Sequence, residues 1–329
     1  MKYYDKNPNT TVLIPSYCNA NCGFCFWNRD KKIPSDFNAY ADKLIESLDS
    51  IYTPTISISG GEPTMFDHKK LVAVLYILKS RTKKMVLNTN GFRLYELLQR
   101  DDVDRDLIQH INISRHAIDE AENIGIFNTD SIPEKEKLIK IISLANTKAI
   151  DVNCNFVYQE DDEVDIIALT NFCKEIGFSS LSLRKDIFQK LDISKCEKDL
   201  INSGYKALSK GGCPVCGQNT YIINGLTTIF KYGVMETADY FEDDVAYENI
   251  IHQNGELSHY WDKIELKESV DDILYVQPLS SCGGTYRCSP VKACGGGCGQ
   301  SIETPSCGGC GRGYFEENVV NNMKYIINL

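Results

Sequence analysis

Three cysteines near the N-terminus have a spacing that could bind a metal centre. Cys18, Cys22 and Cys25 form a C-x3-C-x2-C pattern directly after the short apolar run 11–15. Thiolates are soft ligands, and three of them can hold three irons of a [4Fe–4S] cluster, whereas full cysteine ligation would need four. The spacing therefore suggests an open iron that could bind a small molecule. The alternative is part of a zinc site that is completed elsewhere in the chain.

A second motif favours the cluster. The segment 59–63, Ser-Gly-Gly-Glu-Pro, follows the strand-like run 55–58, one strand–helix–strand unit after the cysteines. In this order and at this distance, the motifs resemble the radical S-adenosylmethionine (SAM) superfamily. Its hallmark is a CxxxCxΦC loop, in which Phe24 is the aromatic Φ, followed by a GGEP motif after the second strand. The resemblance covers roughly residues 8–190.

Length, composition and charge argue against a membrane, secreted or nucleic-acid-binding protein. The 329 residues can form one large domain and a smaller one. The longest apolar run, 71–78, is too short to span a bilayer, and the N-terminus lacks the apolar stretch of a signal peptide, so we expect a cytoplasmic protein without membrane contact. A net charge of −10 argues against a nucleic-acid partner. Fourteen cysteines in a chain without a signal favour metal binding over disulfides.

Alternating strand and helix patterns predict an α/β fold. Helical periodicity predicts helices over 36–50, 67–80, 134–146 and 162–176, and another that begins near Phe92. Strand-like runs cover 11–14, 55–59, 84–89, 110–115, 150–157 and 180–184. Such alternation produces parallel βα units. Radical SAM enzymes commonly have six of them, so we expect a partial (β/α)6 TIM-like barrel.

Several predicted strands have one apolar and one polar face, because successive side chains of a strand point to opposite sides. The polar face carries Ser57, Ser59, Asn88, Asn90, Asn112, Ser114, Asn153, Asn155, Ser182 and Arg184. Buried polar groups are costly unless they are hydrogen-bonded. We therefore expect a lumen filled by water or ligand. The alternative is that these strands are half-exposed.

The resemblance implies which residues bind SAM. In the family, the GGEP segment contacts the methionine amino group, and a polar residue that ends the fourth strand contacts the ribose or carboxylate. A segment that continues from the fifth strand contacts the adenosine. A guanidinium at the end of the sixth strand suits a carboxylate, although a structural ion pair is the alternative. The predicted SAM-binding residues are Phe24, Ser59, Gly60, Gly61, Glu62, Asn90, Ser114, Asn153 and Arg184.

Two further polar residues follow Ser114. Arg115 and His116 could face a substrate. A lone histidine is more often structural.

The C-terminal third is rich in cysteine. Cys213 and Cys216 form a C-P-x-C-G knuckle, which is usually paired with another. The tail adds Cys282, Cys288, Cys294, Cys298, Cys307 and Cys310. The stretch 288–298 resembles part of the SPASM or twitch auxiliary-cluster extension of peptide-modifying radical SAM enzymes, but Tyr260 stands where that pattern has cysteine. An auxiliary Fe–S cluster, a zinc module, a fused substrate peptide and a flexible tail remain open interpretations.

These features predict three parts and one activity. Residues 1–190 form the barrel, 191–265 a helix and β-hairpin extension, and 266–329 a Cys/Gly-rich metal-binding module. The resemblance implies that a [4Fe–4S] cluster reductively cleaves SAM to a 5′-deoxyadenosyl radical, with an electron donor such as flavodoxin or ferredoxin. Peptide or protein modification is the first substrate class because of the tail. Nucleoside or small-metabolite modification is the second. A non-catalytic Fe–S or zinc protein is the alternative of another class.

Overall fold

The structure is a computed structural model that describes residues 2–3, 9–25, 36–51, 53–158, 164–185, 195–208, 218–231, 245–246, 248–259 and 274–275. Within these residues, one ten-stranded sheet has the order β12-β11-β2-β3-β4-β5-β6-β7-β9-β8. Its centre consists of six neighbouring parallel strands: β2 (Asn9–Ile14), β3 (Thr55–Gly60), β4 (Lys84–Thr89), β5 (His110–Ser114), β6 (Asp151–Tyr158) and β7 (Ser180–Lys185). All six predicted strands are confirmed.

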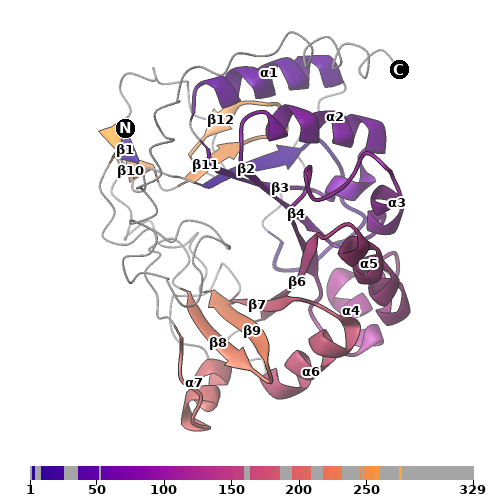
Figure 1. Ribbon diagram of the computed structural model, residues 1–329, viewed down its shortest axis with the longest axis vertical. Coiled ribbons are helices and arrows are strands. Elements are labelled where there is room, and N and C mark those ends of the chain that lie inside the picture. Colours follow the sequence, from indigo (N-terminus) through magenta and orange to yellow (C-terminus); the bar gives the residue numbers. More distant parts are fainter. Residues whose placement is uncertain are drawn as a thin grey trace.

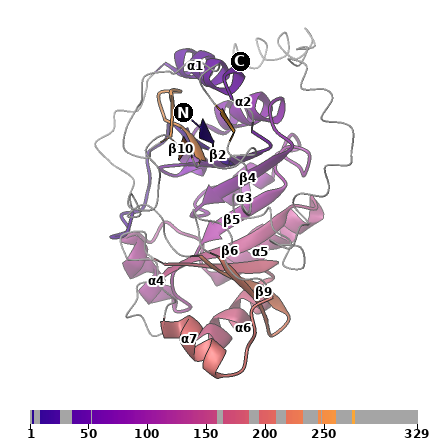
Figure 2. The ribbon, with the colours of Figure 1, turned by 90° about the vertical axis from the view of Figure 1, so that its left-hand side faces the viewer.

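Helices cover the outside of the curved sheet (Figure 1). They are α1 (Phe37–Asp49), α2 (His68–Lys79), α3 (Leu94–Leu98), α4 (Glu120–Phe127), α5 (Lys135–Thr147) and α6 (Ile166–Ile176). Figure 2 shows the strands stacked one above another from β2 to β6. The sheet ends at β12 and β8 and does not close on itself, as expected for a partial barrel. No helix in the described part of the chain is long and apolar enough to cross a membrane.

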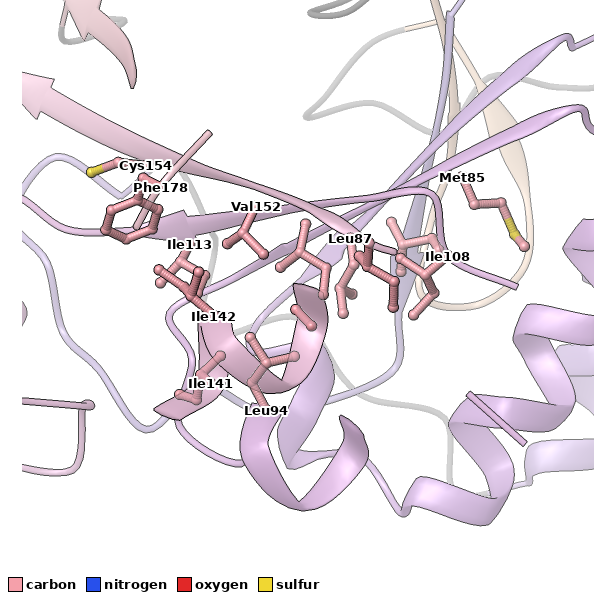
Figure 3. Close-up of a cluster of buried hydrophobic side chains, with 14 of the residues drawn as sticks. Met85, Leu87, Leu94, Ile108, Ile113, Ile141, Ile142, Val152, Cys154 and Phe178 are labelled. Carbon is pink, nitrogen blue, oxygen red and sulfur yellow. The ribbon is translucent and has the colours of Figure 1, made fainter. Parts of the chain in front are cut away.

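The helix-facing side of the sheet is the hydrophobic core. Alternate residues such as Leu87, Ile113 and Val152 project to this side, where they pack against Ile141 and Ile142 of α5 (Figure 3). Each of these five side chains is no more than 1% exposed. Burial of one such side chain contributes about 1.5–3 kcal/mol relative to leaving it in water. The period-two alternation of these strands thus fixes which face meets the helices.

The other face carries a ladder of polar side chains that satisfy one another. Asn153 donates to Asn112 (2.9 Å), Asn112 to Asn88 (2.7 Å), and Asn88 to the backbone oxygen of Ile58 (3.0 Å). Ser180 donates to Asn153 at 2.8 Å. Parallel pairing places these residues in register across four strands. At this level the polar side chains therefore bond to one another across the sheet, and a lumen filled by water or ligand stays a prediction.

Strands from the predicted extension continue the same sheet at both edges. The hairpin β8 (Asn219–Ile223) and β9 (Leu226–Lys231) joins β7, with β9 parallel to it. At the other edge, β11 (Glu248–Ile251) lies parallel to β2, and β12 (Leu257–Ser258) follows. The helix α7 (Lys195–Asn202) precedes the hairpin. The extension therefore enlarges the barrel sheet.

A small separate sheet joins β1 (Lys2–Tyr3), β10 (Val245–Ala246) and β13 (Leu274–Tyr275). Most of the predicted C-terminal module lies outside the described residues. So do both cysteines of the knuckle and all six of the tail: Cys213, Cys216, Cys282, Cys288, Cys294, Cys298, Cys307 and Cys310.

Candidate functional site

The three-cysteine loop follows β2 at the carboxyl ends of the parallel strands, the edge where barrel enzymes place their active sites. Cys18 and Cys22 are half-buried, and Cys25 is exposed. The Cys25 amide donates to the Cys22 oxygen at 3.2 Å. No three His, Cys, Asp or Glu side chains of the described residues converge on a single-ion site. A cluster does not require such convergence, since each thiolate holds its own iron.

The loop is anchored on α4 and the segment that follows it. The Asn21 amide donates to the Phe127 oxygen, and the Asn19 side chain donates to the Ser131 oxygen, both at 2.8 Å. Ala20 packs with Phe127 and Ile132, and two of the loop cysteines contact this apolar cluster. Helix α4 was not among the helices predicted from the sequence. Its signals are Asp119, whose carboxylate caps the Glu122 amide, and Asn128, whose left-handed backbone ends the helix.

Gly60 and Gly61 bring the end of β3 against the same loop. Gly60 has a φ of 139°, and a Cβ there would lie 2.7 Å from the Ile14 oxygen. A Cβ on Gly61 would lie even closer to the Ser16 oxygen. The Glu62 amide donates to the Tyr17 oxygen at 2.8 Å. Gly60 is thus required where the end of β3 meets β2, and Gly61 where the chain meets the cysteine loop, in addition to any role toward a ligand.

The carboxylate of Glu62 is fully occupied by protein donors. It accepts hydrogen bonds from the Thr64 amide (2.9 Å), the Thr64 hydroxyl (2.7 Å), the Thr89 hydroxyl (2.5 Å) and the Asn90 amide (2.6 Å). Glu62 is 1% exposed. Burial raises its pKa above the ordinary value, and these hydrogen bonds oppose that rise. The carboxylate therefore joins the turn η1 (Pro63–Met65) to the residues that follow β4.

Asn90 carries this connection to the cysteine loop. Its side-chain nitrogen lies 2.8 Å from Asn19 Oδ1 and 4.0 Å from Cys18 Sγ. Its side-chain oxygen accepts from the Phe92 amide at 3.0 Å. The predicted SAM-binding residue is thus in contact with the first cysteine of the motif.

Phe24 of the CxΦC pattern rests on His116. The two rings meet edge to face with centroids 4.8 Å apart, and His116 also stacks on Phe127 at 4.8 Å. The Val157 amide donates to His116 Nδ1 at 3.0 Å, so this nitrogen carries no proton. Burial lowers the pKa of His116 to about 3. His116 is therefore a neutral structural support for the cysteine loop.

Arg115 is also structural. It is 1% exposed and donates to the Ala117 oxygen (2.7 Å), the Ile118 oxygen (2.9 Å) and Glu120 Oε2 (2.8 Å). Its guanidinium carbon lies 5.3 Å from the ring centre of Phe172. These contacts occupy the guanidinium inside the protein.

The remaining predicted SAM-binding residues fall into two groups. Ser59, Ser114 and Arg184 are half-buried and lie at or next to the carboxyl ends of β3, β5 and β7. Arg184 Nε is buried and has no hydrogen-bond partner within the described residues. Asn153 differs because it is fully buried near the amino end of β6 and belongs to the polar ladder.

Comparisons with known proteins agree with this geometry. Residues 9–120 match the family described as a 4Fe-4S single cluster domain. Two proteins of Methanocaldococcus jannaschii are named as glycyl-radical enzyme activating enzymes. One is 29% identical over 113 residues, or 34% of this chain and 42% of that protein. The other is 23% identical over 175 residues, which are 52% of this chain and 71% of that protein. The match thus spans less than half the length of the first relative.

A solved structure shares the fold. SuiB of Streptococcus suis bound to S-adenosylmethionine has a TM-score of 0.52 and 18% identity, over 80% of this chain and 63% of that one. The three-cysteine loop and the Gly-Gly-Glu-Pro segment packed against it, the matched 4Fe-4S domain and this fold are similar to those of the radical SAM superfamily.

Proposed function

We propose that this protein is a radical SAM enzyme that binds a [4Fe–4S] cluster through Cys18, Cys22 and Cys25. The observation that carries the proposal is that these cysteines lie at the carboxyl edge of the sheet, on a loop packed against the Gly-Gly-Glu-Pro segment. Three soft thiolates suit iron and leave one iron of a four-iron cluster open. When bound, such a cluster supplies the electron for reductive cleavage of SAM.

The chain's own residues would hold SAM beside this loop. Because the Glu62 carboxylate is occupied, we propose that the Gly-Gly-Glu-Pro segment contacts the methionine amino group through backbone oxygens. Arg184 is the residue proposed for the SAM carboxylate, supported by its buried Nε, which has no hydrogen-bond partner among the residues that the structure describes. Phe24, Ser59 and Ser114 complete the proposed pocket. Asn153 supports the sheet beneath it.

Peptide or protein modification is the proposed substrate class. The two relatives from Methanocaldococcus jannaschii are named for the activation of glycyl-radical enzymes, which are proteins. The cysteine- and glycine-rich tail, whose pattern partly resembles auxiliary-cluster extensions, supports the same class. An auxiliary Fe–S cluster or zinc at the knuckle and tail cysteines, and flavodoxin or ferredoxin as electron donor, belong to this proposal. Nucleoside or small-metabolite modification is the alternative.

Anaerobic reconstitution tests the proposal. The protein should take up iron and sulfide, show a reducible [4Fe–4S] signal by electron paramagnetic resonance, and form 5′-deoxyadenosine from SAM and dithionite. A bound cluster without 5′-deoxyadenosine would favour a non-catalytic Fe–S protein. Zinc uptake without sulfide would contradict the cluster.

A further inference from the structure

We propose that Asn90 is a positioning residue that couples Glu62 to the cluster loop and sets the reduction potential of the cluster through Cys18. This inference rests on the proposed function, because it requires a cluster on the three cysteines. It differs from the role that the sequence suggested for Asn90, which was direct contact with SAM.

The orientation of Asn90 is fixed from both sides. Its backbone amide donates to Glu62 Oε2 at 2.6 Å, and its side-chain oxygen accepts from the Phe92 amide at 3.0 Å. Because a backbone N–H can only donate, the side-chain oxygen must face Phe92. The side-chain nitrogen is therefore directed at Asn19 and Cys18. Asn90 is 7% exposed, so little of it remains for solvent.

Glu62 holds the turn that presents Asn90. Its carboxylate accepts from both the Asn90 amide and the Thr89 hydroxyl, and the same hydroxyl accepts from the Gly91 amide at 2.9 Å. An ionised carboxylate has only acceptors, which suits a site with four surrounding donors. A glutamine here would place an NH₂ group against one or more of those donors. Because the Glu62 carboxylate holds the Asn90 amide and the Asn90 side chain contacts the cysteine loop, Glu62 acts on this loop through Asn90.

The contact with Cys18 has a chemical consequence. One-electron reduction adds negative charge to a cluster and its thiolates. Hydrogen bonds to the cluster sulfurs stabilise that charge and raise the reduction potential. Outer residues that hold metal ligands tune the centre in this way. The Cys18 sulfur accepts from the Ala20 amide at 3.4 Å, and the Asn90 side chain adds a second, longer contact at 4.0 Å.

The test is an anaerobic redox titration of the reconstituted full-length protein, monitored by electron paramagnetic resonance. Asn90→Leu removes the donor at similar volume, and Asn90→Ala removes it without bulk. We expect both to make the midpoint more negative. A tenfold rise in the oxidised-to-reduced ratio at a fixed solution potential would correspond to about 59 mV for one electron.

Asn112→Leu is the matched control. Asn112 is a buried asparagine on the same face of the sheet, but its side chain bonds to Asn88 and Asn153. The control should lose stability and keep the wild-type midpoint. If the Asn90 variants lose their iron while circular dichroism stays unchanged and the control keeps its iron, positioning of the loop by Asn90 is also supported.

Other outcomes separate the two levels of the proposal. A wild-type protein without a cluster contradicts the proposed function. A wild-type cluster with the same midpoint in both Asn90 variants overturns only the role of Asn90. Weaker SAM binding at an unchanged midpoint also overturns it and assigns Asn90 to SAM.

Discussion

The ring of Phe24 meets the imidazole of His116 edge to face, with centroids 4.8 Å apart and planes at 82°. This contact links the cysteine loop to the segment after β5, although Phe24 and His116 are 92 positions apart in the sequence. His116 is 5% exposed and is held by the Val157 amide and by stacking on Phe127. The loop therefore depends on a residue that sequence motifs do not include.

Replacement of His116 should loosen this support. His116→Ala leaves the partly buried Val157 amide without its acceptor, which costs up to about 1–3 kcal/mol, and the lost ring adds the cost of a cavity. His116→Gln offers an acceptor again and should recover part of the loss. Urea unfolding of both variants checks this expectation. Wild-type stability of His116→Ala would contradict the structural role.

His110, a buried histidine of β5, should make stability depend on pH. Burial, and then the charges of Lys84 and Lys231, lower the pKa of His110 to about 3. The unfolded chain takes up this proton near pH 6.5. Between these values the unfolded state binds more protons, so the stability contributed by His110 is complete above pH 6.5 and falls as pH drops toward 3.

The measurement is the free energy of unfolding at pH 7.5 and pH 5. Between pH 7.5 and pH 5, the free energy of unfolding of His110→Gln should fall by about 2 kcal/mol less than that of wild type. This difference corresponds to the roughly 1.5 pH units between pH 5 and the pKa of the unfolded chain. His116→Gln tests the buried His116 in the same way. Parallel pH profiles for wild type and His110→Gln would show that His110 takes up its proton in the folded state as readily as in the unfolded chain, which would contradict the lowered pKa.

Arg184 and Asn153 should respond differently to mutation. Arg184→Ala should weaken SAM binding by about 1.5–3 kcal/mol, the range for a charge-assisted hydrogen bond, with little change in stability. Asn153→Ala should instead destabilise the fold by about 1–3 kcal/mol, because Ser180 and Asn112 lose a buried partner. Exposed Asn146 on α5 supplies a control, Asn146→Ala. Equilibrium dialysis and urea unfolding measure the two effects. Unchanged SAM affinity with lost stability would make Arg184 structural.

The cysteine-rich tail should carry metal of its own. Glycine-rich loops with few apolar residues need metal or packing on another domain for order. A chain that ends at Asp271 keeps β11 and β12 at the edge of the sheet, so it should keep the first cluster. It should hold less iron or zinc than the full-length chain and cleave SAM without turning over a substrate. Equal metal content in the two would leave the fused-peptide and flexible-tail interpretations.

The sequence predicted the centre of the sheet because period-two alternation and βα spacing are local signals. Strands such as β4, with buried Met85 and Leu87, follow this pattern. The edges could not be placed in the same way. β11 pairs with β2 across more than 230 residues, and Gln253 donates to the backbone oxygens of Ile14 and Ser16 at 2.9 and 3.1 Å. Nothing local in the sequence indicates this partner.

The predicted site residues divide for a similar reason. Motifs identified Cys18, Gly60 and Glu62, but spacing alone could not show that the Glu62 carboxylate faces Thr64, Thr89 and Asn90. Polar residues on one strand face were predicted to meet water or ligand. The register between β5 and β6 places Asn112 beside Asn153, and their side chains form a hydrogen bond. Contacts between strands that are far apart in the sequence therefore decide whether a polar side chain supports the fold or can bind a ligand.

The central claim is tested most directly by 5′-deoxyadenosine formation in the variant that replaces Cys18, Cys22 and Cys25 by Ala. Cys154→Ala is the matched control, because Cys154 is buried in the core on the helix-facing side (Figure 3). With SAM and dithionite under anaerobic conditions, wild type and the control should form 5′-deoxyadenosine, and the triple variant should form none. Undiminished formation by the triple variant would contradict a radical SAM cluster on this loop.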